Sequence, residues 1–187
     1  MASVITATTT SGLTQSADNS GVLQLASGTG NLVTIPSVTG TAMVSGNMPA
    51  FLLTRSSSYG ISNNTTATKV TLDTAIYDNF SGFNSSTNTY TIPVTGRYFV
   101  EWSVSFTSFA TNQVFLEAML YKNNSFYADF LQNNMTSNGS TYTGVGTSLV
   151  LNLTAGDTLS LYQSYAAGNL LINHDGYRTK LTGHYLG

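Results

Sequence analysis

The chain contains no cysteine among its 187 residues. A disulfide framework, a thiolate metal site and a cysteine nucleophile are therefore all excluded. Stability must come from side-chain packing and from assembly with other chains.

Charge is also scarce, because only 7% of the residues are Asp, Glu, Lys or Arg, against about 25% in an average soluble domain. The basic residues form no run or stripe; they are Arg55, Lys69, Arg97, Lys122, Arg178 and Lys180. No nucleic-acid partner is expected, since phosphate binding depends on clustered positive charge.

Long apolar runs are missing too. No stretch approaches the roughly 18 apolar residues of a membrane-spanning helix, and the first six residues, MASVIT, lack the charge and apolar run of a secretory signal. We expect that the protein does not insert into a membrane. We also expect that it is made in the cytoplasm of a bacterial host cell.

What remains is a chain that should fold, because 11% of its residues are aromatic and its formal net charge is only −2. Ser, Thr, Asn and Gly supply the missing polarity and favour tight turns, which is typical of an all-β protein. The length suits one domain with an appended arm. The composition changes near Pro49, so we predict an N-terminal anchoring arm over residues 1–49 and a head over residues 50–187.

Within the arm, short apolar runs at residues 22–25 and 32–35 flank the turn residues SGTG. They predict either a small hairpin or two strands without partners. Because an isolated two-stranded hairpin is marginally stable, we expect this segment to fold against other copies or another protein.

In the head, residues 98–106 alternate strictly, with Tyr98, Val100, Trp102, Val104 and Phe106 on one face. Apolar and polar residues also alternate in residues 149–153 and 158–162. Gly156 and Asp157 between them favour a turn, so we predict a hairpin. Helical periodicity is weak throughout, so we predict a two-sheet sandwich of about ten strands.

The strand expected at residues 114–121 is apolar on both faces. Val114, Leu116, Ala118 and Leu120 share the face expected in the core, whereas Phe115, Met119 and Tyr121 share the other. We interpret the second face as a subunit interface, so that Phe115→Asp should weaken assembly. The alternative is that Phe115 and Met119 are scattered surface apolar residues, which are common.

Several motifs carry a family resemblance when they are taken in chain order. They are Phe83, YTIPVTGRYF at residues 90–99, LYKN at 120–123, LNLTAGD at 151–157 and LTGHYL at 181–186. Together they resemble the globular head of the complement subcomponent q family, which belongs with the tumour-necrosis-factor-like jelly rolls. The resemblance implies a ten-stranded jelly roll and a compact homotrimer, with the last strand near the threefold axis. Phe83, Tyr90, Tyr98 and Trp102 would fill the sandwich interior.

The arm carries a second resemblance. The segments GLTQSADNSGVLQL at residues 12–25, VTIP at 33–36 and GTAMV at 40–44 are similar to segments of bacteriophage virion proteins, especially tail-fibre and head-decoration proteins. Animal members of the complement family usually follow a signal peptide and a collagen-like Gly-X-Y stalk, and this chain shows neither pattern. This departure favours a virion protein over a secreted immune protein.

Candidate chemistry is sparse. His174 and Asp175 are adjacent, but no nucleophile motif accompanies them, and we interpret them as part of a polar turn. Asp73 and Asp78 would need a further loop to complete a calcium site. We therefore expect no enzymatic activity, no catalytic residue, no cofactor and no metal.

Two functions remain open. In the favoured hypothesis, residues 1–49 attach homotrimers to other virion proteins as a capsid decoration or cement protein, because the chain has no long shaft. In the alternative, the chain is a short tail fibre or knob that binds a host surface glycan or receptor through loops such as residues 59–61 and 133–135. Tyr59, Tyr127, Tyr142 and Tyr165 would then be candidate sugar-stacking residues, or would cover the trimer seam.

Overall fold

The computed structural model describes residues 23–26, 32–35, 48–61, 64–107, 115–133, 143–166, 170–172 and 178–187. The chain divides into two compact units, Met1–Gly46 and Asn47–Gly187. The anchoring role that the sequence assigns to residues 1–49 stays a prediction.

The first unit contains one antiparallel pair of strands, β1 (Leu23–Ala26) and β2 (Leu32–Ile35). The register sets Leu23 opposite Ile35 and Leu25 opposite Val33. Of the two arrangements left open by the sequence, the structure therefore has the hairpin.

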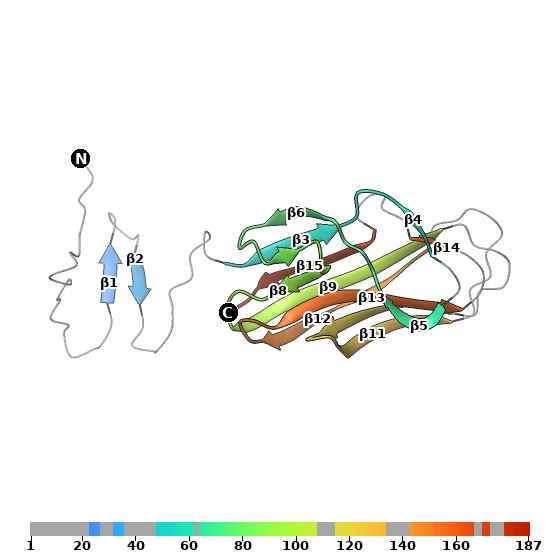
Figure 1. The fold of residues 1–187 in the computed structure, drawn as a ribbon. Helices are drawn as coiled ribbons and strands as arrows, with labels where there is room; N and C mark the ends of the chain where they lie inside the picture. The colour runs from blue at the N-terminus through green and yellow to red at the C-terminus, as the bar shows by residue number, and fades with distance from the viewer. Residues whose placement is uncertain are drawn as a thin grey trace. The chain divides into compact units, whose positions relative to one another are not determined.

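The second unit is a sandwich of two antiparallel sheets (Figure 1). One sheet has six strands, in the order β11 (Ser125–Asn133), β10 (Phe115–Lys122), β13 (Thr158–Ala166), β8 (Thr89–Thr91) and β7 (Phe83–Asn84), with β5 (Asn64–Lys69) also paired to β13. The other has seven: β12 (Thr143–Leu153), β9 (Gly96–Thr107), β15 (Lys180–Tyr185), β3 (Ala50–Thr54) and β6 (Thr74–Asp78), with β14 (Leu170–Ile172) beside β9 and β4 (Tyr59–Ile61) beside β14. The predicted all-β, two-sheet fold is confirmed.

The alternation of β9 sets the core. Tyr98, Val100, Trp102, Val104 and Phe106 are all 0% exposed, as the sequence predicts. Trp102 also donates a hydrogen bond from Nε1 to the carbonyl oxygen of Ala118, 3.1 Å away in the opposite sheet. Its indole therefore both fills the space between the sheets and links them.

A second cross-sheet contact is aromatic. Phe51 on β3 and Tyr90 on β8 are fully buried and stack with their ring centroids 3.7 Å apart. Burial, with Asp78 nearby, raises the pKa of Tyr90 well above its usual value, and burial raises that of Tyr98 to about 12. Phe83, also predicted in the interior, is only half-buried and packs against the core from its margin.

The hairpin predicted from residues 149–153 and 158–162 is wrong. β12 pairs with β9 in one sheet, whereas β13 pairs with β10, β8 and β5 in the other. The turn at Gly156, whose φ is 93°, carries the chain from one sheet to the other. Turn chemistry reverses the chain, but the partners available to each strand decide whether the two strands pair.

A hairpin not expected from the sequence joins β10 to β11. Its two-residue loop is Asn123 and Asn124, with φ values of 53° and 61°. Two consecutive positive φ values are what a tight primed turn requires, and Asn tolerates them better than most residues. The strand that follows forms the end of the six-stranded sheet.

Asp157 joins this hairpin to the turn between the sheets. Its carboxylate accepts hydrogen bonds from Asn123 Nδ2 (2.7 Å) and the Thr154 backbone N–H (2.8 Å), and lies 2.8 Å from Lys122 Nζ. Partial burial opposes ionisation, but these donors outweigh it and lower the pKa of Asp157 to about 2. The carboxylate therefore stabilises the folded chain only while it is ionised.

We expect Asp157→Asn to lower the free energy of unfolding at neutral pH by about 1.5–3 kcal/mol, the range for hydrogen bonds to a charged group. Since the folded pKa lies below the unfolded value near 3.8, the native contribution is present above that value and lost as pH falls toward 2. Urea unfolding from pH 7 to pH 2 should show the two chains converging in acid. A difference that persists unchanged at pH 2 would contradict this assignment.

Candidate functional site at the edges of strands β11 and β12

Exposed large apolar side chains gather on two strands. Ten such side chains occur among the described residues, and six of them lie on β11 or β12: Phe126, Tyr127, Phe130, Leu131, Leu149 and Val150. A concentration of this kind on a protein surface marks a contact with another molecule more often than isolated apolar residues do.

Both strands end their sheets. Among the described strands, β11 pairs only with β10 and β12 pairs only with β9, so each has an unpaired edge. The two edges lie close together, one from each sheet, along the lower side of the head in Figure 1.

The apolar side chains occupy both faces of each edge. Leu149 is 42% exposed and its neighbour Val150 is 59% exposed, and consecutive residues of a strand point to opposite faces. Phe130 and Leu131 repeat this arrangement on β11. Edge strands that face water are usually short or protected by charged side chains. β11 and β12 are nine and eleven residues long, and the only charged residue in them is Asp129. Their composition suits an edge that another chain covers.

The apolar surface continues over the outer face of the seven-stranded sheet. Val150 lies opposite Phe99 in the register, and Phe99 lies opposite His184 on β15. The rings of Phe99 and His184 are 5.3 Å apart. This row extends the edge toward the centre of that sheet.

A family model for the C1q domain matches residues 50–186. The chain belongs to the C1q domain family. A search of curated protein sequences finds no match.

Solved structures with the same fold are distant in sequence. Residues of this C1q chain superpose on the Eiger TNF of S. frugiperda with a TM-score of 0.56 and 14% identity, covering 75% of this chain and 93% of that one. Murine APRIL superposes with a TM-score of 0.56 and 13% identity, covering 75% of this chain and 100% of that one. The globular domain of zebrafish complement 1qA superposes with a TM-score of 0.51 and 18% identity, covering 75% of this chain and 98% of that one. At these identities the similarity concerns the fold.

The face of β10 predicted as the subunit interface does not need a partner. Met119 is only 4% exposed within the single C1q chain, and Tyr121 stacks on Tyr162 with ring centroids 3.8 Å apart. Phe115 is half-buried, and Val114 lies outside the described residues. The argument for this face therefore fails, because Tyr162 and other residues of the same chain already cover much of it.

A carboxyl group lies on the same face. Glu117 accepts a hydrogen bond from the Ser164 hydroxyl group and lies beside Asp129. Burial and the neighbouring Asp129 raise the pKa of Glu117. Asp129 belongs to β11, and Glu117 lies opposite Leu131 in the register, so this pair adjoins the exposed apolar edge.

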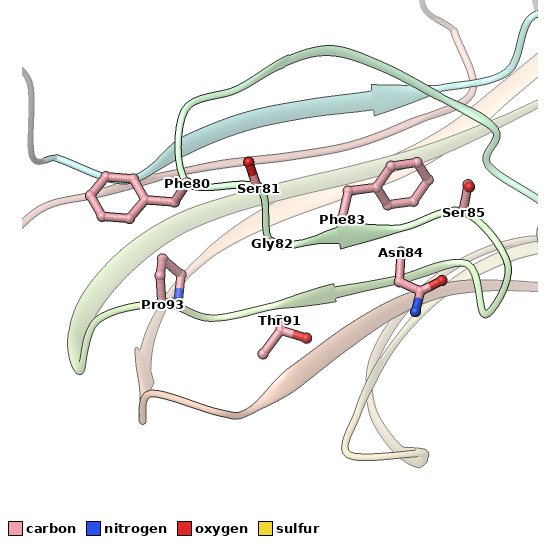
Figure 2. A pocket seen from close by; sticks show the side chains of 8 residues that line it. All are labelled: Phe80, Ser81, Gly82, Phe83, Asn84, Ser85, Thr91 and Pro93. Carbon is pink, nitrogen blue, oxygen red and sulfur yellow. The ribbon is translucent and has the colours of Figure 1, made fainter.

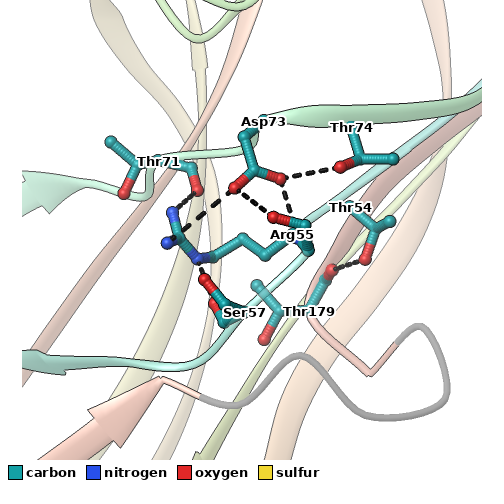
Figure 3. A network of polar contacts seen from close by, with 8 residues as sticks. Thr54, Arg55, Ser57, Thr71, Asp73, Thr74 and Thr179 are labelled. Carbon is teal, nitrogen blue, oxygen red and sulfur yellow. Dashed lines mark hydrogen bonds and ion pairs between the residues drawn. The ribbon is translucent and has the colours of Figure 1, made fainter.

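The possible calcium ligands do not come together. Asp73 accepts hydrogen bonds from the Ser56 backbone N–H, the Ser56 hydroxyl and the Thr74 hydroxyl at 2.7–2.9 Å, and Arg55 lies 4.0 Å away (Figure 3). Partial burial opposes ionisation, but these donors lower the pKa of Asp73. Asp78, at the other end of β6, instead accepts from the backbone N–H groups of Phe80 and Phe83. Among the described residues, no three His, Asp or Glu side chains gather as metal ligands.

The other predicted candidates divide into two groups. His174, Asp175, Asn134, Met135 and Tyr142 lie outside the described residues. Of the remaining tyrosines, Tyr165 is fully buried and donates to the Ile61 carbonyl oxygen, and Tyr59 lies under the Arg55 guanidinium group at 4.1 Å. Tyr127, 45% exposed, keeps the surface position that sugar stacking requires.

The described part of the chain includes no helix with the length and apolar character needed to cross a bilayer. The exposed edge of β11 was missed in the sequence, although the consecutive apolar pair in DFLQ at residues 129–132 carries the signal. The same signal is present in LV at residues 149–150.

Proposed function

We propose that this chain is a non-enzymatic structural protein of a bacteriophage particle, which forms homotrimers and decorates the capsid. Its N-terminal arm attaches it to other virion proteins, and its C1q head protrudes. The observation that carries the assembly is the exposed apolar edge of β11 and β12.

The edge supports a closed ring of copies. Each chain offers one long apolar edge and one broad sheet face, so a rotation that places the edge of one copy on the face of the next uses two different surfaces. Contacts of this kind close into a ring at three copies when the rotation is 120°. The row of Val150, Phe99 and His184 is the part of the sheet face next to the edge.

The arm supports attachment through apolar and backbone contacts. Residues 1–46 contain one charged residue, Asp18, and neither Lys nor Arg. Ion pairs therefore contribute little to any contact that this segment makes. Among the described strands, β1 and β2 pair only with each other, so each keeps one edge for pairing, and a partner strand there would stabilise a hairpin that is marginal alone.

A non-enzymatic role is supported by the way the carboxylates are used. Asp73, Asp78 and Asp157 each accept hydrogen bonds from neighbouring backbone N–H groups, and so hold turns and loops in place. Carboxylates that accept these backbone hydrogen bonds stabilise the local fold.

We expect removal of residues 2–46 to leave a folded head that still forms trimers but no longer joins the particle. The compact unit Asn47–Gly187 contains every core residue identified among the described residues. Purified particles from a host that supplies either form would be compared by quantitative mass spectrometry, with light scattering on the free protein.

Many copies of the complete chain per particle, and none of the shortened one, would support decoration. Equal incorporation of both forms would overturn the role of the arm. A few copies located at the tail would instead favour the second candidate, a short tail fibre or knob that binds a host receptor. That candidate is favoured by the exposed rings of Phe126 and Tyr127.

A further inference from the structure

Glu117 lies half-buried among apolar side chains on the outer face of the six-stranded sheet. Side chains alternate between the two faces along β10, so Phe115 and Met119 are its neighbours on that face. The register sets Glu117 opposite Leu131 on β11 and Ser164 on β13, and the Ser164 hydroxyl donates a hydrogen bond to Glu117 Oε2. Partial burial among apolar groups disfavours the charged form of this carboxyl group.

A second carboxyl group, that of Asp129, comes from the edge strand β11. The register sets Asp129 opposite Met119 and Leu131 opposite Glu117, so the two acidic residues are diagonal neighbours on one face. Their carboxyl groups lie close enough for a hydrogen bond. Such a bond requires a proton on one of them, because a carboxylate only accepts. Burial raises the pKa of Glu117, the Ser164 hydroxyl opposes this rise and Asp129 adds to it, so Glu117 is the group that keeps the proton.

No cation among the described residues neutralises this pair. Lys122, at the end of β10, is 2.8 Å from an Asp157 carboxylate oxygen, and β11 and β13 contain no basic residue. Lys69 on β5 donates to the Thr87 carbonyl oxygen at 3.2 Å. A proton is therefore what relieves the repulsion between the two carboxylates. The other titratable side chains of these four strands are phenols, which are uncharged at neutral pH and below: Tyr121, Tyr127, Tyr162 and Tyr165.

The rest of this sheet contributes little that titrates in the same range. Figure 2 shows the eight residues that line an open pocket at the β7–β8 hairpin, between Phe80 and Pro93, and none of them is ionisable. Asp157, at the turn into β13, has a pKa lowered to about 2, so it is already ionised where Glu117 titrates. Within the described part of this sheet, a pH response above 4.5, the ordinary pKa of a glutamate, therefore belongs to Glu117 and Asp129.

We infer that Glu117 and Asp129 form an acid-sensitive switch beside the exposed edge of β11. In acid, Glu117 holds a proton and donates a hydrogen bond to the Asp129 carboxylate, which links β10 to β11. Loss of that proton breaks the hydrogen bond and leaves two negative charges side by side. Among the described strands β11 pairs only with β10, so the repulsion acts on a strand that is held from one side.

The consequence for assembly rests on the proposed function. A neighbouring copy that covers Leu131, 45% exposed in the single chain, would also remove water from Glu117 opposite it. Burial favours the neutral carboxyl group. Assembly through this edge therefore takes up a proton, and the trimer should be tighter in acid than at neutral pH.

The switch can be observed directly, because Glu101 and Glu117 are the only glutamates in the chain. Glutamate labelled with carbon-13 gives two side-chain carboxyl signals in NMR spectra, and Glu117→Gln identifies one of them by removing it. We expect the Glu117 signal to titrate with a midpoint above 4.5, its ordinary value. Asp129→Asn removes the neighbouring charge, so the midpoint should fall. A midpoint at or below 4.5, or one that Asp129→Asn does not move, would overturn the switch.

Glu117→Gln also tests the effect on stability, because its amide mimics the protonated acid: the oxygen accepts from Ser164 and the NH₂ group donates to Asp129. The folded pKa of Glu117 lies above the unfolded value of 4.5, so the wild-type chain loses stability relative to the variant as pH rises through the folded pKa. Urea unfolding at equal chain concentrations should show the variant more stable near neutral pH. The ratio of the two unfolding constants should change by up to about tenfold per pH unit above 4.5, and the two chains should converge below it.

Glu101→Gln is the matched control, since it makes the same change at a carboxylate that lies 2.7 Å from Lys180 Nζ. It should not stabilise the chain at neutral pH. A Glu117→Gln chain less stable than wild type near neutral pH, or a difference that does not vary with pH, would overturn the switch. Light scattering in acid and at neutral pH separates the two proposals: a monomer at every pH would overturn the trimer, whereas the NMR titration decides the switch in monomer or trimer.

Discussion

Replacement of Leu149 and Val150 together by aspartate is expected to convert the proposed trimer into a folded monomer. Both side chains are exposed in the single chain, so charges there are tolerated before assembly. In the proposed trimer the remaining exposed surface of Leu149 and Val150 would be buried, with a gain below the about 1.5–3 kcal/mol of complete burial for each side chain. Aspartate loses this gain and places unpaired charges in a dry interface. Light scattering would show the loss of mass, and circular dichroism the retained β-structure.

The matched control lies at the opposite end of the same sheet. Ile76 and Tyr77 on β6 are 44% and 48% exposed, so Ile76→Asp with Tyr77→Asp makes the same change in charge on another edge strand. This variant should remain a trimer. A trimer that survives aspartate at residues 149 and 150 would show that the edge is not the interface. Phe115→Asp would then test the face predicted from the sequence.

Replacement of Trp102 by alanine should cause the largest loss of stability in the head, about 3–5 kcal/mol for a fully buried large aromatic side chain. The indole is 0% exposed, and its loss leaves a cavity between the sheets and removes the hydrogen bond to Ala118. A domain is typically stable by about 5–15 kcal/mol, so this change removes a large part of the total. Urea unfolding followed by circular dichroism measures it.

Trp102→Phe is the informative comparison, because it restores most of the apolar volume without the N–H group. It should cost clearly less than Trp102→Ala. If the two variants were equally destabilised, the hydrogen bond to Ala118 would matter more than the packing. If neither lost stability, Trp102 would not be the link between the sheets.

The features that could be predicted from the sequence are those set by neighbouring residues. The alternation of residues 98–106 fixes which face of β9 is buried, because consecutive side chains of a strand point to opposite sides. The arm hairpin is one of the two arrangements that the short apolar runs around a Gly-rich turn left open. The family resemblance, carried by the order of several short motifs, agrees with the C1q match over residues 50–186.

The candidate site was predicted only in kind. An apolar surface for assembly was expected on Phe115 and Met119, whereas the exposed apolar side chains are concentrated on β11 and β12, where we propose the contact. Met119 is buried because its register partner Tyr162 belongs to a strand about forty residues away. No local pattern records that pairing, and so none distinguishes a covered face from an exposed one.

The sequence by itself therefore determined the fold class, the inward faces of the longest strands and the scarcity of charge, all of which depend on composition and on local periodicity. The tertiary structure alone decided that β12 and β13 enter different sheets, that β11 and β12 remain at the edges, and that Asp78 holds the loop before β7 by two hydrogen bonds. The physical reason is that strand pairing and burial are set by contacts between residues distant in the chain, where many partners are sterically possible and the packing of the whole core selects among them.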